Sequence, residues 1–88
     1  MRGVELLNKR VVTSGIELGR VVDVILDETA DRAIGMDVRC RDGVHRYLPI
    51  ATVDLVGEDV VVASPLVLLE RDQLDFYRAN GRALRSPR

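Results

Sequence analysis

Two stretches of the chain decide the fold: Gly15-Ile-Glu-Leu-Gly-Arg-Val-Val-Asp-Val-Ile-Leu-Asp27 and, further along, Arg46-Tyr-Leu-Pro-Ile50. Both are short apolar runs bounded by glycine, proline or charged residues. Runs of this length and composition are typical of β-strands joined by tight turns. They predict a strand-rich chain in which glycine marks the turns and bends.

The apolar residues alternate with a period of two, which indicates strands with one dry face. In residues 34–41 the apolar side chains share one face: Ile34, Met36, Val38 and Cys40. The other face carries Gly35, Asp37, Arg39 and Arg41. In residues 20–26 one parity holds Val22, Val24 and Leu26, and the other holds Val21, Asp23 and Ile25. We expect half-buried antiparallel strands here, joined by a polar hairpin loop over residues 27–32.

The next turn, over residues 41–44, allows two registers. A two-residue Asp42-Gly43 turn would set Leu48 opposite Asp37. A three-residue loop with Gly43 as a left-handed bulge instead sets apolar residues against each other: Met36 with Leu48 and Ile34 with Ile50. A slip of one residue moves every side chain to the other face, so core matching favours the bulged hairpin.

Further short strands are predicted at Lys9–Val12, Val53–Val56 and Asp59–Ala63. Pro65 lacks a backbone N–H and ends the sheet there. Five or six short antiparallel strands favour a mainly β fold, a small β-barrel over about residues 4–63, because closure removes exposed strand edges.

A helical stripe follows the strands and predicts a C-terminal helix of about residues 70–80. The stripe consists of Leu69, Gln73 and Phe76 with Leu74 and Tyr77. Ser64 and Asp72 are both acceptable N-caps, and Gly81 is a plausible stop. We expect residues 1–80 to form one domain and residues 81–88 to form a basic, flexible tail.

The order of three motifs resembles the PRC-barrel family: Leu6-Leu-Asn-Lys-Arg-Val-Val12, Gly15-x-x-x-Gly19-x-Val-x-Asp23-Val, and Arg46-Tyr-Leu-Pro49 before a terminal valine strand. The family takes its name from the cytoplasmic part of a photosynthetic reaction-centre subunit. It also supplies the C-terminal domain of a bacterial ribosome-maturation factor. The resemblance implies a small β-barrel that acts as an interaction module rather than as an enzyme.

At five positions that match the family pattern or depart from it, we expect a particular backbone conformation or contact. Gly15 suits a turn with positive φ, and Gly19 suits a strand bend or a close backbone approach. Asp23 is expected to pair with a backbone amide or with an arginine across the sheet. Pro49 fixes φ where its strand bends. Asn8 stands where the family more often has glycine, and asparagine tolerates the left-handed region.

The length, net charge and cysteine count of the chain limit the classes of protein to which it can belong. With 88 residues there is room for one small core, and domains of this size often gain stability by self-association, which favours a homodimer. A net charge of −1 gives no general attraction to nucleic acid or anionic lipid. No apolar run approaches the length of a membrane span, and a single free cysteine fits a reducing compartment, so we expect a cytoplasmic protein with no membrane insertion.

No set of residues predicts a catalytic, cofactor or metal site. His45 is the only histidine, and the bulged register places it across from Arg39 on the outer face. Cys40 shares the apolar face and reads as a core residue. The acids Asp23, Asp27, Glu28 and Asp31 lack the spacing of a calcium loop and read as part of a solvated hairpin.

The C-terminal helix carries the candidate partner-binding surface: Leu74, Phe76, Tyr77 and Arg78. Aromatic residues beside arginine are typical of interface hot spots. The alternative is that the same stripe folds onto the barrel as a lid. We expect a non-catalytic module that associates with itself and with an unidentified protein partner. An RNA- or ribosome-associated factor that uses the basic tail is the alternative, and a ligand or redox sensor is less favoured.

Overall fold

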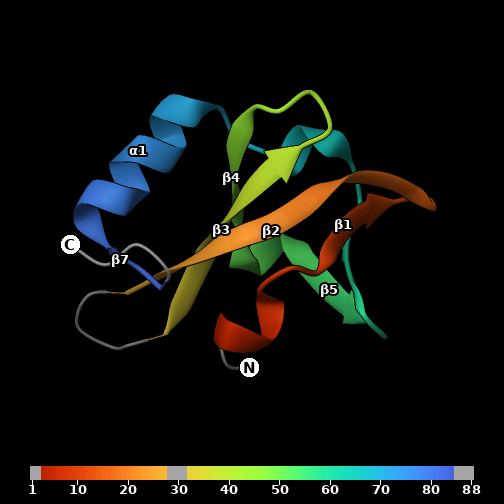
Figure 1. Ribbon diagram of the computed structural model, residues 1–88, viewed down its shortest axis with the longest axis horizontal. Helices are drawn as coiled ribbons and strands as arrows, with labels where there is room; N and C mark the ends of the chain where they lie inside the picture. The colour runs from red at the N-terminus through yellow and green to blue at the C-terminus, as the bar shows by residue number, and fades with distance from the viewer. Residues whose placement is uncertain (1–2, 28–31, 85–88) are drawn as a thin grey trace.

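The computed structural model describes residues 3–27 and 32–84, which form a curled sheet with a helix beside it (Figure 1). The strands are β1 (Arg10–Thr13), β2 (Ile16–Leu26), β3 (Ala33–Cys40), β4 (His45–Pro49), β5 (Val53–Val56), β6 (Asp59–Val62) and β7 (Arg82–Ala83). The helix is α1 (Arg71–Asn80), and the 3₁₀ turns are η1 (Gly3–Leu6), η2 (Ile50–Thr52) and η3 (Pro65–Val67).

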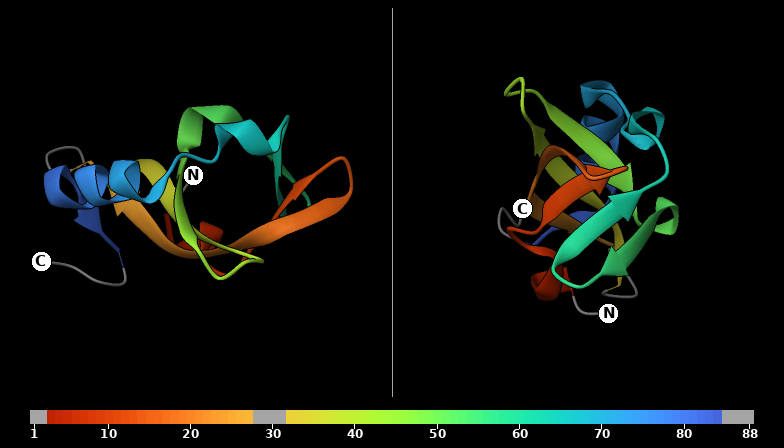
Figure 2. Two further views of the ribbon diagram at one scale, coloured as in Figure 1. Left: turned by 90° about the horizontal axis from the view of Figure 1, so that it is seen from above. Right: turned by 90° about the vertical axis from the view of Figure 1, so that its right-hand side faces the viewer.

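The fold is mainly β, as predicted, and the expected small barrel is a curled half-barrel sheet of six strands with one C-terminal helix. Six strands follow the order β4-β3-β2-β1-β6-β5, and the short β7 pairs with β2. Neighbouring strands run antiparallel except β1 and β6, which run parallel. No tight turn joins β1 to β6, so the chain does not impose the antiparallel direction on this pair. Figure 2 shows the strands curled into a ring, with α1 outside it.

The bulged β3–β4 hairpin is confirmed. Gly43 adopts φ +82°, and the Cys40 amide donates to the Val44 carbonyl at 3.0 Å. Met36 pairs with Leu48, and both side chains are fully buried. Core matching therefore selected the correct register.

The predicted pairing of Ile34 with Ile50 is wrong. Strand β4 ends at Pro49, and Ile50 begins η2. The β2–β3 register then skips Ile34, which makes it an extra, bulged residue. Ile34 packs in the cluster beneath α1, whereas Ile50 packs against the main core.

A second bulge, in β2, corrects the predicted faces of that strand. Val21 pairs with Val38 and Asp23 pairs with Asp37, so Val22 is the extra residue between them. The bulge turns Val21 to the same side as Val24, in the main core, and leaves Val22 half-buried. Strict alternation of side chains, read from the sequence, cannot show this change because it assumes a strand without bulges.

The main core fills the inside of the curl. Its fully buried members come from η1 and five strands: Leu6, Val11, Val21, Val24, Met36, Val38, Leu48 and Val60. Partly buried Val67 and Leu68 pack on it from the segment after β6. The segment that leaves the sheet at Pro65 thus covers the inside of the half-barrel.

The expected backbone roles are confirmed at four positions. Gly15 has φ +79° in the β1–β2 turn, and Asn8 has φ +68°. A Cβ on Gly19 would lie 2.4 Å from the carbonyl oxygen of Arg39, so only glycine allows this approach of β2 to β3. Pro49, with φ −63°, turns the chain from β4 into η2.

Helix α1 occupies the predicted range, and Gly81 ends it by donating its amide to the Tyr77 carbonyl at 2.8 Å. The expected N-caps are wrong. Glu70 is the N-cap residue, without a side-chain hydrogen bond, and Asp72 lies inside the first turn. Ser64 caps η3 instead, where its hydroxyl accepts from the Leu66 amide at 3.2 Å.

The expected flexible tail also needs correction for its first residues. Arg82 and Ala83 form β7 against Leu26 and Ile25 of β2, and Ala83 is only 4% exposed. The Leu84 amide donates to the Val24 carbonyl at 2.7 Å. Residues 85–88 lie outside the described residues, as do Glu28 and Asp31 of the acidic hairpin loop.

Candidate functional site: buried carboxylates beneath the C-terminal helix

A second apolar cluster lies between α1 and the outer face of the sheet. Ile25, Tyr47 and Leu74 are its buried members, and Tyr77 packs against it. The rings of Tyr47 and Tyr77 stack with centroids 4.3 Å apart and planes inclined by 9°. The sheet therefore has apolar contacts on both faces at this end.

Gly35 makes room for the aromatic stack. A Cβ at this position would lie 2.2 Å from the Tyr47 ring, which covers the bare backbone of β3. The Tyr47 hydroxyl donates to the carbonyl oxygen of Ile34 at 3.1 Å. Glycine in β3 thus positions the tyrosine on which α1 rests.

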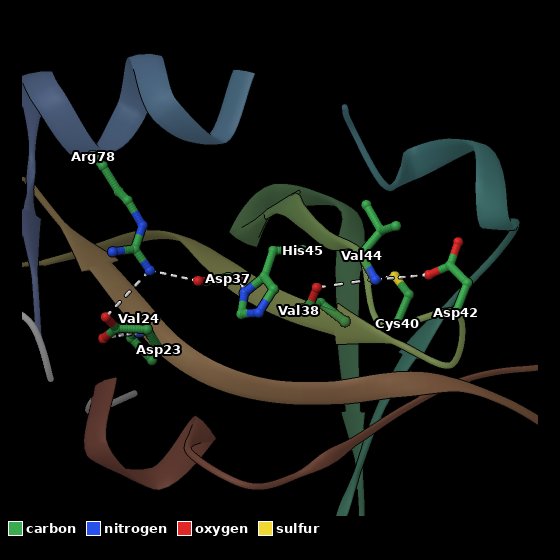
Figure 3. A network of polar contacts seen from close by, with 9 residues as sticks. All are labelled: Asp23, Val24, Asp37, Val38, Cys40, Asp42, Val44, His45 and Arg78. Carbon is green, nitrogen blue, oxygen red and sulfur yellow. Dashed lines mark hydrogen bonds and ion pairs between the residues drawn. The ribbon is translucent and has the colours of Figure 1, made fainter. Parts of the chain in front are cut away.

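Two carboxylates are buried beside this cluster. Asp23 of β2 and Asp37 of β3 are register partners, and they are 3% and 1% exposed. The bulge at Val22 turns Asp23 to the face that α1 covers, and Asp37 lies on this face because it alternates with the core residues Met36 and Val38. Figure 3 shows them below Arg78 of the helix.

Arg78 binds both acids. Its Nη2 lies 2.5 Å from Oδ2 of Asp37 and 3.6 Å from Oδ2 of Asp23. On the other side, Nδ1 of His45 lies 2.8 Å from Oδ1 of Asp37. The Val24 amide donates to Oδ1 of Asp23 at 2.9 Å. The expected amide partner of Asp23 is confirmed, but the arginine comes from the helix rather than from across the sheet.

This geometry holds α1 in position through the attraction between Arg78 and the buried carboxylates. A buried carboxylate is stable as an anion only when charged or polar groups replace its water. Arg78 is the helix cation that does so for Asp37, and it is itself about one-third exposed. Loss of the Arg78 guanidinium with α1 still in place would leave two buried acids without this cation.

An open hollow of about 270 Å³ lies beside the network. Its lining comes from β3, β4 and α1: Asp37, His45, Arg71, Leu74, Asp75 and Arg78. Nδ1 of His45 is occupied by Asp37, so Nε2 is the ring nitrogen left for other contacts. Among residues 3–27 and 32–84, no three His, Cys, Asp or Glu side chains gather in a way that could hold a metal ion.

The four predicted partner-binding residues do not share one exposed surface. Leu74 is 3% exposed, Tyr77 stacks on Tyr47, and Arg78 binds the carboxylates. Phe76 is 56% exposed, and its ring meets Tyr77 edge-on. The helix lies on the sheet in the way that the lid alternative describes.

Sequence reasoning missed the network because of Asp37. In an alternating strand, its neighbours Arg39 and Arg41 placed it on the solvent face, and both arginines are indeed exposed. Its carboxylate is instead covered by contacts with Arg78 of α1 and His45 of β4. The available signal was an acid within the apolar run of each of two adjacent strands, Asp23 and Asp37, with an arginine in the following helix. His45 does lie across from Arg39, and Cys40 is a buried core residue, as predicted.

The pKa values of Tyr47 and Asp42 are shifted from their ordinary values. Burial, with the neighbouring Tyr77, raises the pKa of Tyr47 to about 12. At the hairpin end, the hydrogen bonds from Arg46 and from the Val44 amide lower the pKa of Asp42. The Asp42–Arg46 pair lies at the surface, in the β3–β4 turn, and takes no part in the helix contact.

The family model of the PRC-barrel domain matches residues 1–69. The chain therefore belongs to the PRC-barrel family. Both buried aspartates lie within the matched segment, whereas α1 and Arg78 lie beyond it. A search among curated proteins finds no match. In the described part of the chain, no helix is long and apolar enough to cross a membrane.

Proposed function

We propose that the protein is a non-catalytic interaction module of the cytoplasm that associates with itself and with a protein partner. Membership of the PRC-barrel family supports this role. The buried, unpaired thiol of Cys40 supports a reducing compartment.

The observation that carries the proposal is the exposure of large apolar side chains on so small a domain. Leu66 is 88% exposed and Phe76 is 56% exposed. Ile16, Val44, Leu55 and Val56 are also exposed. Exposed apolar side chains favour contact with another protein surface where they form a contiguous patch.

The carboxylate network supports a structural role for the polar groups. The two oxygens of Asp37 already contact Arg78 and His45. Asp23 contacts Arg78 and the Val24 amide. The network therefore fixes α1 on the sheet and leaves the apolar side chains to make outside contacts.

The alternative, an RNA- or ribosome-associated factor, rests on the arginines near the C-terminus. Arg78 is one of them, and its charge is opposed by Asp37 and Asp23. This lowers the positive charge available for phosphates. A salt-dependent RNA affinity that disappears on removal of residues 85–88 would favour the alternative.

Sedimentation equilibrium of the unmodified chain tests the proposal. We expect a mass that rises with concentration from the 9.8 kDa of the single chain toward twice that value. A constant mass of one chain up to roughly 1 mM, a concentration that would detect even weak association, would contradict self-association.

A further inference from the structure

The two edges of the sheet differ in how they are covered. At the β4 edge, Tyr47 and Leu69 exchange backbone hydrogen bonds of 3.0 and 2.7 Å. Strand β5 forms the other edge, and among the described residues it pairs only with β6. Its sequence, Val-Asp-Leu-Val, contains no lysine, proline or bulge that would keep another strand away.

The backbone N–H and C=O groups of Leu55 point outward from this free edge. The Val53 amide donates to the Ile50 carbonyl in η2, so it is directed away from β6. Peptide groups of alternate residues in a strand point the same way. The N–H and C=O of Leu55 are therefore directed away from β6 as well, where a further strand would bind.

The Leu55 side chain lies where the core is open. Its register partner is Val60, which is fully buried in the main core, so both side chains belong to the inner face of the sheet. Leu55 is nevertheless 38% exposed. An added strand would cover this side chain and extend the core.

We propose that β5 pairs antiparallel with β5 of a second copy of this chain, about a two-fold axis that passes through Leu55. The proposal rests on the self-association proposed above and assigns it a surface. The two Leu55 residues would exchange both backbone hydrogen bonds and place their side chains together. The half-barrels would then share one continuous sheet.

The acidic residues in and beside β5 favour the register with the axis at Leu55. In an antiparallel two-fold pair, the axis passes through one residue, and its neighbours on either side lie opposite each other. An axis at Leu55 sets Asp54 opposite Val56 and Val53 opposite Gly57. An axis at Asp54 would set two aspartates face to face. An axis at Val56 would set Asp54 against Glu58, and like charges directly opposite are unfavourable.

Two charged variants test the axis by sedimentation equilibrium. Leu55→Asp and Leu55→Lys each place like charges across it, so each should weaken the dimer by roughly 100-fold. An equimolar mixture should restore association, because aspartate then faces lysine. Gln73→Asp, which adds the same negative charge at an exposed polar position of α1, is the matched control and should dimerise normally.

Each result decides between the two proposals. A monomeric unmodified chain overturns self-association and this interface together. A dimer that survives in both Leu55 variants overturns the β5 interface alone. Two monomeric variants that do not associate when mixed overturn the axis at Leu55.

Hydrogen exchange of the unmodified chain gives an independent readout if a variant unfolds. The Leu55 amide should exchange at least about tenfold more slowly as the concentration passes through the dimerisation range. The Val53 amide, already bound by Ile50, should change less. A Leu55 rate that stays constant while the mass doubles would exclude pairing through β5.

Discussion

At the scale of single residues, the role of Gly35 depends on the ring that lies over it. Tyr47 covers this glycine, donates to the Ile34 carbonyl, and stacks on Tyr77 of the helix. The absence of a side chain in β3 is thus coupled to the position of α1. The sequence shows a glycine in a strand, but not the tyrosine that requires it.

We expect Gly35→Ala to lower the free energy of unfolding by about 1–3 kcal/mol, because the added methyl group displaces the Tyr47 ring. Urea denaturation measures the loss. In a Tyr47→Leu background the same alanine should cost less, since the ring atoms that it meets are gone. An equal loss in both backgrounds would mean that the ring is not the obstacle.

The raised pKa of Tyr47 predicts a loss of stability in alkali. Its folded pKa is about 12 and its ordinary value is 10.0. Above pH 10 the unfolded chain loses this proton while the folded chain keeps it, so the free energy of unfolding falls between pH 10 and pH 12, by about 1–3 kcal/mol in total. Urea denaturation from pH 8 to pH 12 should show this slope, and Tyr47→Phe should flatten it. A slope that Tyr47→Phe leaves unchanged would assign it to other groups.

At the scale of elements, the β3–β4 hairpin shows what local sequence determines. Gly43 and the apolar pair Met36 and Leu48 were enough to select the bulged loop and its register, because a slip would have exposed the core. The bulges at Val22 and Ile34 could not be predicted. Each inserts one unpaired residue, and a pattern of strict alternation cannot show where such a residue falls.

Met36→Ala and Leu48→Ala should each reduce the free energy of unfolding by about 2–5 kcal/mol, because each leaves a cavity between fully buried neighbours. Chemical denaturation measures the effect. Val44→Ala, in the same hairpin but exposed, should change stability by less than about 0.5 kcal/mol. Losses below that value for both core variants would show that the register is wrong.

At the scale of the whole molecule, the chain joins a PRC-barrel to a helix that lies beyond the family match. The family resemblance and the strand pattern predicted a small β-barrel, which the structure shows as a half-barrel, and the apolar stripe predicted the helix. The contact between them was not predictable, because Asp37 looked like a solvent-facing residue of an alternating strand. Its burial depends on Arg78, which lies 41 residues later.

Phe76 and Tyr77 distinguish the two roles predicted for the helix, a partner-binding surface and a lid on the barrel. If Phe76 forms part of a partner surface, Phe76→Ala should weaken association without loss of stability, since its ring is 56% exposed. Tyr77→Ala should instead destabilise the fold, because it removes the stack on Tyr47. Light scattering and urea denaturation distinguish the two effects. An unchanged oligomeric mass for the double alanine variant would exclude this helix as the dimer contact.

Arg78 fixes α1 to the barrel through the buried acids Asp23 and Asp37. A double-mutant cycle of Arg78→Met and Asp37→Asn, measured by urea denaturation, tests it most directly. We expect a coupling energy of about 1–3 kcal/mol, since either change alone leaves a charge without its partner. Arg71→Met, an exposed arginine of the same helix, should show almost no coupling to Asp37→Asn. Additive effects of Arg78→Met and Asp37→Asn would contradict the claim.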